Sequence, residues 1–215
     1  MQILNWNIDR LKHHHRKGEM AELIEGYEAD VVVLTEADTR LQLKGYPYTT
    51  STEPLEQPYY KTTERRVMVY SKFPILGEVA TYDAQTACCP LLETNLGITA
   101  LYGTVLGIYG NRKPPFKEDL ISQIADWKEI CQTYALTIVG DLNMSFTDNY
   151  YYTEYGREML LAAFEDCDLK NITRNIPDNI DHVLISNALL MTNPEQYTMC
   201  MAIHNEKTLS VHKGI

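Results

Sequence analysis

Acidic and amide side chains follow several apolar segments of the chain, at the points where buried strands would end. Asn7 and Asp9 follow the first apolar segment, Glu36 follows the run DVVVL, and Asp141 and Asn143 follow the run TIVG. Each of these alone is a weak signal, because Asp and Asn at a strand end more often form turns or caps. If the strand ends converge, the side chains would form a site rich in oxygen donors.

A carboxylate and a histidine in the C-terminal part of the chain could transfer protons in a reaction. Asp181 opens the apolar segment DHVLIS, and His212 lies near the C-terminus. A neutral imidazole can take a proton from water or give one to a phosphate oxygen near pH 7. A carboxylate on the other ring nitrogen would fix the tautomer. His182 follows Asp181 on the same predicted strand, so it should point to the opposite face and be structural.

Carboxylate and amide oxygens are the ligands that Mg²⁺ (or Mn²⁺) prefers, and such an ion can neutralise a phosphate oxygen. The sequence therefore predicts a Mg²⁺ or Mn²⁺ cofactor and a phosphoester substrate. The run from His13 to His15 could also bind a metal or phosphate. A solvated turn is the preferred interpretation of this run.

Composition bounds the class of protein. The chain has 215 residues, 45% hydrophobic and 22% charged, which is typical of a soluble globular protein. The net charge of -10 argues against a broad nucleic-acid-binding surface, although a local basic cleft could coexist with it. The five cysteines form no CxxC pair, so we expect buried thiols in a reducing, cytoplasmic compartment. We expect neither a signal peptide nor a membrane span.

The spacing of apolar residues predicts the elements that would position these groups. Helical spacing occurs at residues 18–28, 118–131 and 156–164. Strands are predicted at residues 2–7, 30–34, 66–71, 136–139, 180–186 and 197–203, and within residues 93–103, where the strand is expected to form a hairpin with a neighbour. Residues 208–215 are predicted as a loop that leads into a last short strand. Without repeats or linkers, residues 1–215 are predicted to form a single domain of two packed sheets flanked by helices.

The order of these segments resembles that of the motifs of the endonuclease/exonuclease/phosphatase superfamily, which includes AP endonucleases and pancreatic-type deoxyribonucleases. The matching segments, in order, are LNWNID, VVVLTEAD, VMVYSKFPI, TIVGDLN, IDHVLIS and LSVHKGI. The resemblance implies an α/β fold of the α+β type, in which two mixed, mostly antiparallel sheets are flanked by helices in a four-layer sandwich. It also implies a metal-dependent phosphoesterase.

The resemblance also implies roles for individual residues near the metal. Glu36 matches the principal metal ligand of the superfamily. Asn7 matches an asparagine that helps to bind metal or phosphate, and Asp9 matches a further acidic position of the metal site.

Four residues match catalytic positions of the superfamily. Asp141 is similar to the aspartate that serves the nucleophile or the leaving group, and Asn143 to the asparagine that holds the scissile phosphate. Asp181 and His212 match the catalytic carboxylate–histidine pair.

Two positions depart from the superfamily pattern. Where members usually carry Ser-Asp-His, this chain has Val211 before His212, and valine cannot bind a metal. Where many members carry a phosphate-facing His or Tyr, Val105 occupies the position unless Tyr109 takes it over.

Asn111 and Arg112 lie in the loop that follows this second departure, and we predict that they contact the phosphate of the substrate.

The favoured function is a Mg²⁺-dependent phosphodiesterase or nuclease, with nucleic acid as one candidate substrate. Two alternatives stay open at this point. One is a weak or inactive phosphate-binding protein, because of Val211, and the other is a phosphatase of small molecules or lipid head groups. The oligomeric state is not set by these patterns.

Overall fold

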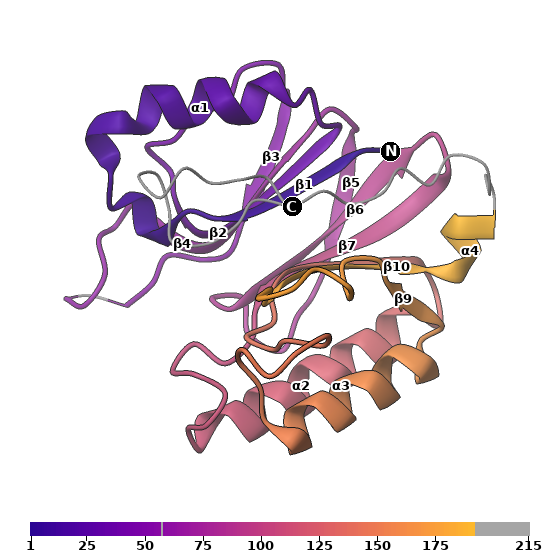
Figure 1. Ribbon diagram of the computed structural model, residues 1–215. Coiled ribbons are helices and arrows are strands. Elements are labelled where there is room, and N and C mark those ends of the chain that lie inside the picture. The colour runs from indigo at the N-terminus through magenta and orange to yellow at the C-terminus, as the bar shows by residue number, and fades with distance from the viewer. Residues whose placement is uncertain (57, 192–215) are drawn as a thin grey trace.

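The computed structural model describes residues 1–56 and 58–191, and it consists of four layers in the order helix, sheet, sheet, helix (Figure 1). The prediction of two mixed sheets flanked by helices is confirmed. Within the described residues, no helix is long and apolar enough to cross a membrane.

The first sheet has four strands in the order β1-β2-β4-β3. β1 (Ile3–Asn7) pairs in parallel with β2 (Val31–Asp38), whereas β4 (Glu64–Ser71) pairs antiparallel with both β2 and β3 (Tyr48–Ser51). Helix α1 (Lys17–Gly26) covers the outer face of this sheet (Figure 1).

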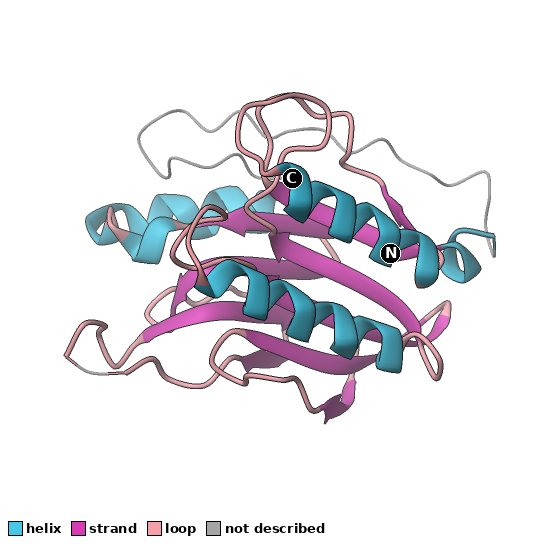
Figure 2. Ribbon diagram, turned by 90° about the horizontal axis from the view of Figure 1, so that it is seen from below, coloured by secondary structure: helices cyan, strands magenta, loops and turns pink. Residues whose placement is uncertain are grey.

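The second sheet has six strands in the order β5-β6-β7-β8-β10-β9. The strands are β5 (Ile75–Val79), β6 (Ala87–Thr94), β7 (Gly97–Val105), β8 (Ala135–Asp141), β9 (Leu169–Asn171) and β10 (Asp181–Ser186). Figure 2 shows α2 (Pro115–Ile130) and α3 (Glu154–Asp166) side by side across the outer face of this sheet. The β7–β8 pair is parallel and the other pairs are antiparallel.

Short helices complete the described part of the chain. Two single 3₁₀ turns, η1 (Asp9–Leu11) and η2 (His14–Arg16), lie between β1 and α1, and η2 contains two of the three histidines for which a solvated turn was predicted. Helix α4 (Asn187–Met191) follows β10.

Three apolar cores separate the four layers. One fills the space between the two sheets, one lies under α1, and one lies between the second sheet and the helices α2 and α3. Strand β2 shows how the sequence supplies two cores at once: Val31 and Val33 face the other sheet, whereas Val32 and Leu34 face α1. A strand with both faces buried is apolar at every position, which explains the unbroken run in this segment.

The predicted elements differ from the structure mainly at their ends. Helix α2 begins at Pro115 rather than residue 118, because proline needs no hydrogen-bond partner in the first turn of a helix. The strand predicted within residues 93–103, paired as a hairpin with a neighbour, is confirmed as β7; it begins at Gly97, whose φ of +104° lies at the turn of the β6–β7 hairpin. Strands β5, β6 and β9 were not predicted, and the strand predicted at residues 197–203 lies outside the described residues.

The expected burial of the cysteines is confirmed for Cys88, Cys89 and Cys167, while Cys131 is half-buried. Burial raises the pKa of the Cys89 thiol to about 12, so this sulfur is an uncharged member of the core. Cys200 lies outside the described residues.

Candidate functional site

Three polar side chains from strands of both sheets meet at one end of the sandwich. The Asn7 amide, at the end of β1, donates hydrogen bonds of 3.2 Å to Glu36 Oε1 and of 3.2 Å to Asp141 Oδ2. Asn7 and Asp141 are buried, and Glu36 is partly exposed. The structure therefore brings together residues that the sequence separates by up to 134 positions.

Glu36 reaches this point because β2 changes its conformation there. Its φ of 42° lies in the left-handed region, which non-glycine residues rarely adopt. In a regular strand, residues 34 and 36 would share a face. Here Leu34 and Ala37 both face the core under α1, so the regular alternation is broken at Glu36. Such backbone strain in an ordinary residue is a feature of functional sites.

Asp141 lies between two strands of the second sheet. It pairs with Val105 on β7 and with Asp181 on β10, so Asp141 and Asp181 are direct cross-strand neighbours. Both carboxylates are 2% exposed. The approach of β7 to β8 depends on Gly140, where a Cβ atom would lie 1.9 Å from the Thr104 carbonyl oxygen.

Asn143 is held in place by hydrogen bonds on several sides. Its backbone N–H donates to Asp141 Oδ1 at 2.8 Å, and its side-chain amide donates to the Leu106 carbonyl at 2.9 Å. The Asn111 amide in turn donates to the Asn143 carbonyl at 2.7 Å. Asn143 has a φ of 48°, and this network stabilises that conformation.

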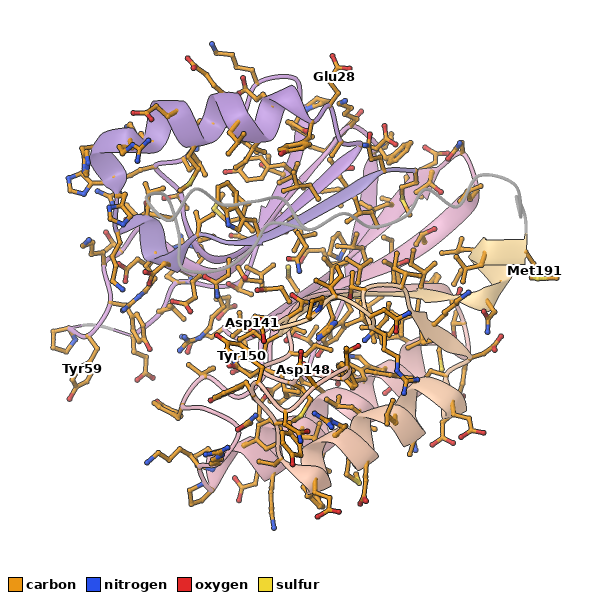
Figure 3. All side chains as sticks on the ribbon, in the orientation of Figure 1. Glu28, Tyr59, Asp141, Asp148, Tyr150 and Met191 are labelled. Atoms are coloured by element: carbon orange, nitrogen blue, oxygen red, sulfur yellow. The ribbon has the colours of Figure 1, made fainter. Side chains whose placement is uncertain are left out.

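A cleft of about 540 Å³ opens at this end of the sandwich, and we call it the candidate cleft. Figure 3 shows Asp141 and Tyr150 next to each other, between the layer of α1 and the layer of α2 and α3. The polar residues that line the candidate cleft include Arg10, Glu36, Arg66, Asp141, Asn143 and Tyr150. Carboxylates, amides and two guanidinium groups can together hold a phosphate group and the groups that react with it.

Two of the predicted phosphate contacts do not line the candidate cleft. Asn111 is buried behind it and holds the backbone of Asn143, so its placement is that of a supporting residue. Arg112 is exposed and also lies outside the lining. Of the two candidates for the phosphate-facing position, Val105 is 3% exposed and Tyr109 is 68% exposed, and both line the cleft.

Asp9 lies just outside the candidate cleft. Its backbone N–H donates to Asn7 Oδ1 at 2.9 Å, and its carboxylate accepts a 2.8 Å hydrogen bond from Lys12. Asp9 thus orients the Asn7 side chain from behind. His212 and Val211 lie outside the described residues, so their predicted roles stay predictions.

Few residues of the described part of the chain are placed to hold a metal ion. Among residues 1–56 and 58–191, no three His, Cys, Asp or Glu side chains gather closely enough to form a metal site by themselves. Glu36 and Asp141 nevertheless direct carboxylate oxygens at one point, the Asn7 amide. Two carboxylates fit Mg²⁺ or Mn²⁺, because Mg²⁺ usually keeps several water ligands and takes one or two from the protein.

The interpretation of His182 as structural is confirmed. The ring is fully buried; its Nε2 donates to the Met144 carbonyl at 2.8 Å, and Nδ1 lies 2.9 Å from Thr173 Oγ1. Burial lowers the pKa of His182 to about 4.

This buried histidine predicts a specific loss of stability in mild acid. The unfolded chain binds a proton at His182 near pH 6.5, whereas the folded chain does so only near pH 4. Stability from this group is present above pH 6.5 and is lost as the pH falls toward 4. The free energy of unfolding is therefore expected to fall by about 2 kcal/mol between pH 7 and pH 5.

Urea denaturation of the wild type and of His182→Gln at these two pH values measures the effect. The substituted protein should be less stable at pH 7, yet show a clearly smaller change between the two pH values. An equal pH dependence in both proteins would show that other groups cause it.

Arg10 was missed by sequence reasoning, although it lines the candidate cleft and its Nε lies 3.6 Å from Glu36 Oε2. Arg10 directly follows the segment WNID, and this position could have identified it as a candidate site residue. Arg66 also lines the candidate cleft. Arg65 instead donates to the backbone carbonyls of Thr62 and Glu64.

Comparison with known proteins gives a family and several similar folds. A model of the Endonuclease/Exonuclease/phosphatase family matches residues 4–203. A search of curated proteins finds no match.

Among solved structures, a 3'-5' exonuclease from Neisseria meningitidis has a TM-score of 0.74 and 15% identity, covering 100% of this chain and 97% of that one. An AP endonuclease from Archaeoglobus fulgidus has a TM-score of 0.73 and 11% identity, with coverage of 100% and 97%. Sphingomyelinase C from Streptomyces griseocarneus has a TM-score of 0.61 and 18% identity, with coverage of 87% and 84%. At these identities the likeness establishes the fold alone.

Proposed function

Because the chain belongs to the Endonuclease/Exonuclease/phosphatase family, whose members hydrolyse phosphoester bonds, we propose that it is a divalent-metal-dependent phosphodiesterase. The observation that carries this proposal is the meeting of Asn7, Glu36 and Asp141 through the two 3.2 Å hydrogen bonds of the Asn7 amide. These residues come from three separate motifs, and Glu36 and Asp141 line one cleft together with Asn143.

In this proposal the residues at the cleft have different roles. Glu36 and Asp141, supported by Asn7, would hold Mg²⁺ or Mn²⁺, which supplies positive charge at the phosphate oxygens. Asn143 binds a phosphate oxygen of the substrate, and Arg66 adds positive charge at the same cleft. In the same proposal, Asp141 also accepts a proton from an attacking water or serves the leaving oxygen.

The Asp181–His212 pair completes the proposed mechanism. Asp181 lies beside Asp141 on the neighbouring strand. We propose that Asp181 orients His212 and that the histidine donates or accepts the proton that the phosphodiester reaction requires. Val211 replaces a metal-binding aspartate of the superfamily pattern, so we expect weaker metal affinity than in family members that carry Ser-Asp-His.

Hydrolysis of bis-p-nitrophenyl phosphate tests this function. Purified protein is expected to release p-nitrophenol with Mg²⁺ or Mn²⁺ and to stop when EDTA is added. The monoester p-nitrophenyl phosphate, run in parallel, separates a diesterase from a phosphatase. Val211→Asp, tested over a range of metal concentrations, should reach full activity at a lower concentration than the wild type. If neither protein hydrolyses either compound, the proposed activity is contradicted.

A further inference from the structure

A second hollow adjoins the candidate cleft, and we call it the basic cleft. Its volume is about 660 Å³, and its lining residues include Arg10, Lys12, His14, Tyr59, Tyr60, Lys61 and Glu64. Arg10 and Tyr60 line both clefts. The two hollows therefore share a wall, and a substrate bound in the candidate cleft can extend into the basic cleft.

The charge of the basic cleft contrasts with that of the whole chain. The protein has a net charge of -10, yet three cations and one carboxylate line this hollow. The Lys12 and Lys61 side chains are 62% and 64% exposed. Lys12 Nζ donates a 2.8 Å hydrogen bond to Asp9 Oδ2, and an ammonium group has two further N–H donors for a ligand. Lys61 Nζ lies 3.8 Å from Glu64 Oε1, which is longer than a hydrogen bond, so its donors are not committed to that carboxylate.

Arg10 lies at the junction of the two clefts in a costly backbone conformation. Its φ is 52°, and its neighbours Asp9 and Leu11 also lie in the left-handed region. Consecutive residues with side chains rarely adopt this conformation. The turn directs the Arg10 guanidinium to the wall between the clefts, with Nε 3.6 Å from Glu36 Oε2. A planar guanidinium there can contact the oxygens of two neighbouring phosphates.

Two tyrosines give the basic cleft an aromatic wall. The Tyr60 hydroxyl accepts a 3.1 Å hydrogen bond from Arg66, and the Arg66 guanidinium lies 5.1 Å from the centre of the Tyr60 ring. Tyr60 is therefore held in place, whereas Tyr59 is 85% exposed and projects from the outer tip of the loop between β3 and β4 (Figure 3). Exposed tyrosines interleaved with cations are typical of surfaces that stack bases and bind phosphates.

We propose that the basic cleft is a second-phosphate subsite, which binds the phosphate next to the scissile one in a single-stranded nucleic acid. This inference rests on the proposed function, because it assumes that the scissile phosphate occupies the candidate cleft. Arg10, Lys12 and Lys61 contact the neighbouring phosphate, and Tyr59 stacks on a base.

The charge and the aromatic residues of the subsite favour a single strand over other phosphoesters. A duplex requires a broad basic surface, and the net charge of -10 argues against such a surface. A substrate with one phosphate would leave the lysines and the tyrosines of the basic cleft unused. A strand with neighbouring phosphates and exposed bases uses both features.

The test measures binding of fluorescein-labelled hexathymidylate by fluorescence anisotropy in EDTA, over a range of NaCl concentrations. The double substitution Lys12→Gln/Lys61→Gln is expected to raise the Kd about tenfold, because it removes two charge-assisted contacts. The slope of log Kd against log salt should fall by about one for each lysine removed. Lys128→Gln is the matched control, because Lys128 lies on α2 and pairs with Asp166.

A mononucleotide, which has only one phosphate, distinguishes binding of the first phosphate from binding of the second. Binding of thymidine 5'-monophosphate, measured by competition, should change much less in the double variant than binding of the hexamer. Tyr59→Ser should weaken hexamer binding without changing the salt slope, because it removes stacking and no charge.

The inference is overturned if the double variant binds the hexamer like the wild type. It is also overturned if the mononucleotide loses as much affinity as the hexamer, since the basic cleft would then hold the first phosphate. Hydrolysis of bis-p-nitrophenyl phosphate by the wild type reports separately on the proposed function. Loss of hexamer affinity without hydrolysis would contradict the function and support the subsite.

Discussion

Replacement of Asp141 by asparagine is expected to lower kcat for bis-p-nitrophenyl phosphate by about a thousandfold or more, as expected for loss of a group that moves a proton in the transition state. Both Asp141 oxygens accept hydrogen bonds, from the Asn143 N–H and from the Asn7 amide. An asparagine of the same shape can keep the first bond. It would direct its own amide at that of Asn7, however, and it carries no charge.

The same change is expected to leave the fold intact. Asp141 on β8 lies directly opposite Asp181 on the neighbouring strand β10. Like charges opposite each other on a sheet are destabilising. Removal of one of these charges should therefore leave the thermal midpoint of unfolding unchanged or raise it.

A steady-state assay and a thermal melt on the same preparation check both statements. Asp166→Asn is the control, because Asp166 is an exposed carboxylate that pairs with Lys128 at the far surface. If Asp141→Asn retained a tenth or more of the wild-type kcat, Asp141 would have no chemical role and the proposed site would be wrong.

Glu36→Gln is expected to weaken the binding of Mn²⁺ by about a hundredfold, since the loss of even an indirect supporting contact often costs ten- to a hundredfold. Glu36 directs one carboxylate oxygen at the same amide as Asp141, and its strained backbone conformation presents it to the cleft. Glutamine has nearly the same shape but lacks the negative charge that a hard cation prefers.

Electron paramagnetic resonance of free Mn²⁺ measures this affinity without any turnover. Glu158→Gln on α3 is the matched control, because Glu158 is exposed and lies outside the cleft. Equal affinities in Glu36→Gln and the wild type would mean that the ion is bound elsewhere. Absence of Mn²⁺ binding by the wild type would contradict the metal-dependent mechanism as a whole.

The layered fold could be predicted from local patterns because each core takes its own set of side chains from the sequence. The unbroken run in β2 indicated a strand buried on both faces, and the two cores on either side of β2 explain it. The spacing in α2 indicated one apolar face, and Leu120, Ile124 and Trp127 are buried there. Strand β5 was missed because its burial alternates only between exposed and half-buried positions, so its apolar pattern is weak.

The candidate site was partly visible in the sequence, because its motifs place polar residues directly after apolar strands. Asn7, Glu36, Asp141 and Asn143 were identified in this way, and they lie together. Asn111 and Arg112 were predicted to contact phosphate because of the loop in which they lie, and neither residue lines the cleft. A loop's composition does not specify which way its side chains point, because that depends on the surfaces against which the loop packs.

By itself, the sequence determined which residue types stand at the strand ends, the sign of the charge, and the family. Only the tertiary structure decided that Arg10 and Tyr60 form a wall shared by two clefts, and that Asp141 lies opposite Asp181. These features depend on strand register and on contacts between segments far apart in the chain. Local spacing does not encode such contacts, because they arise when the two sheets pack face to face and bring the loops at one end together.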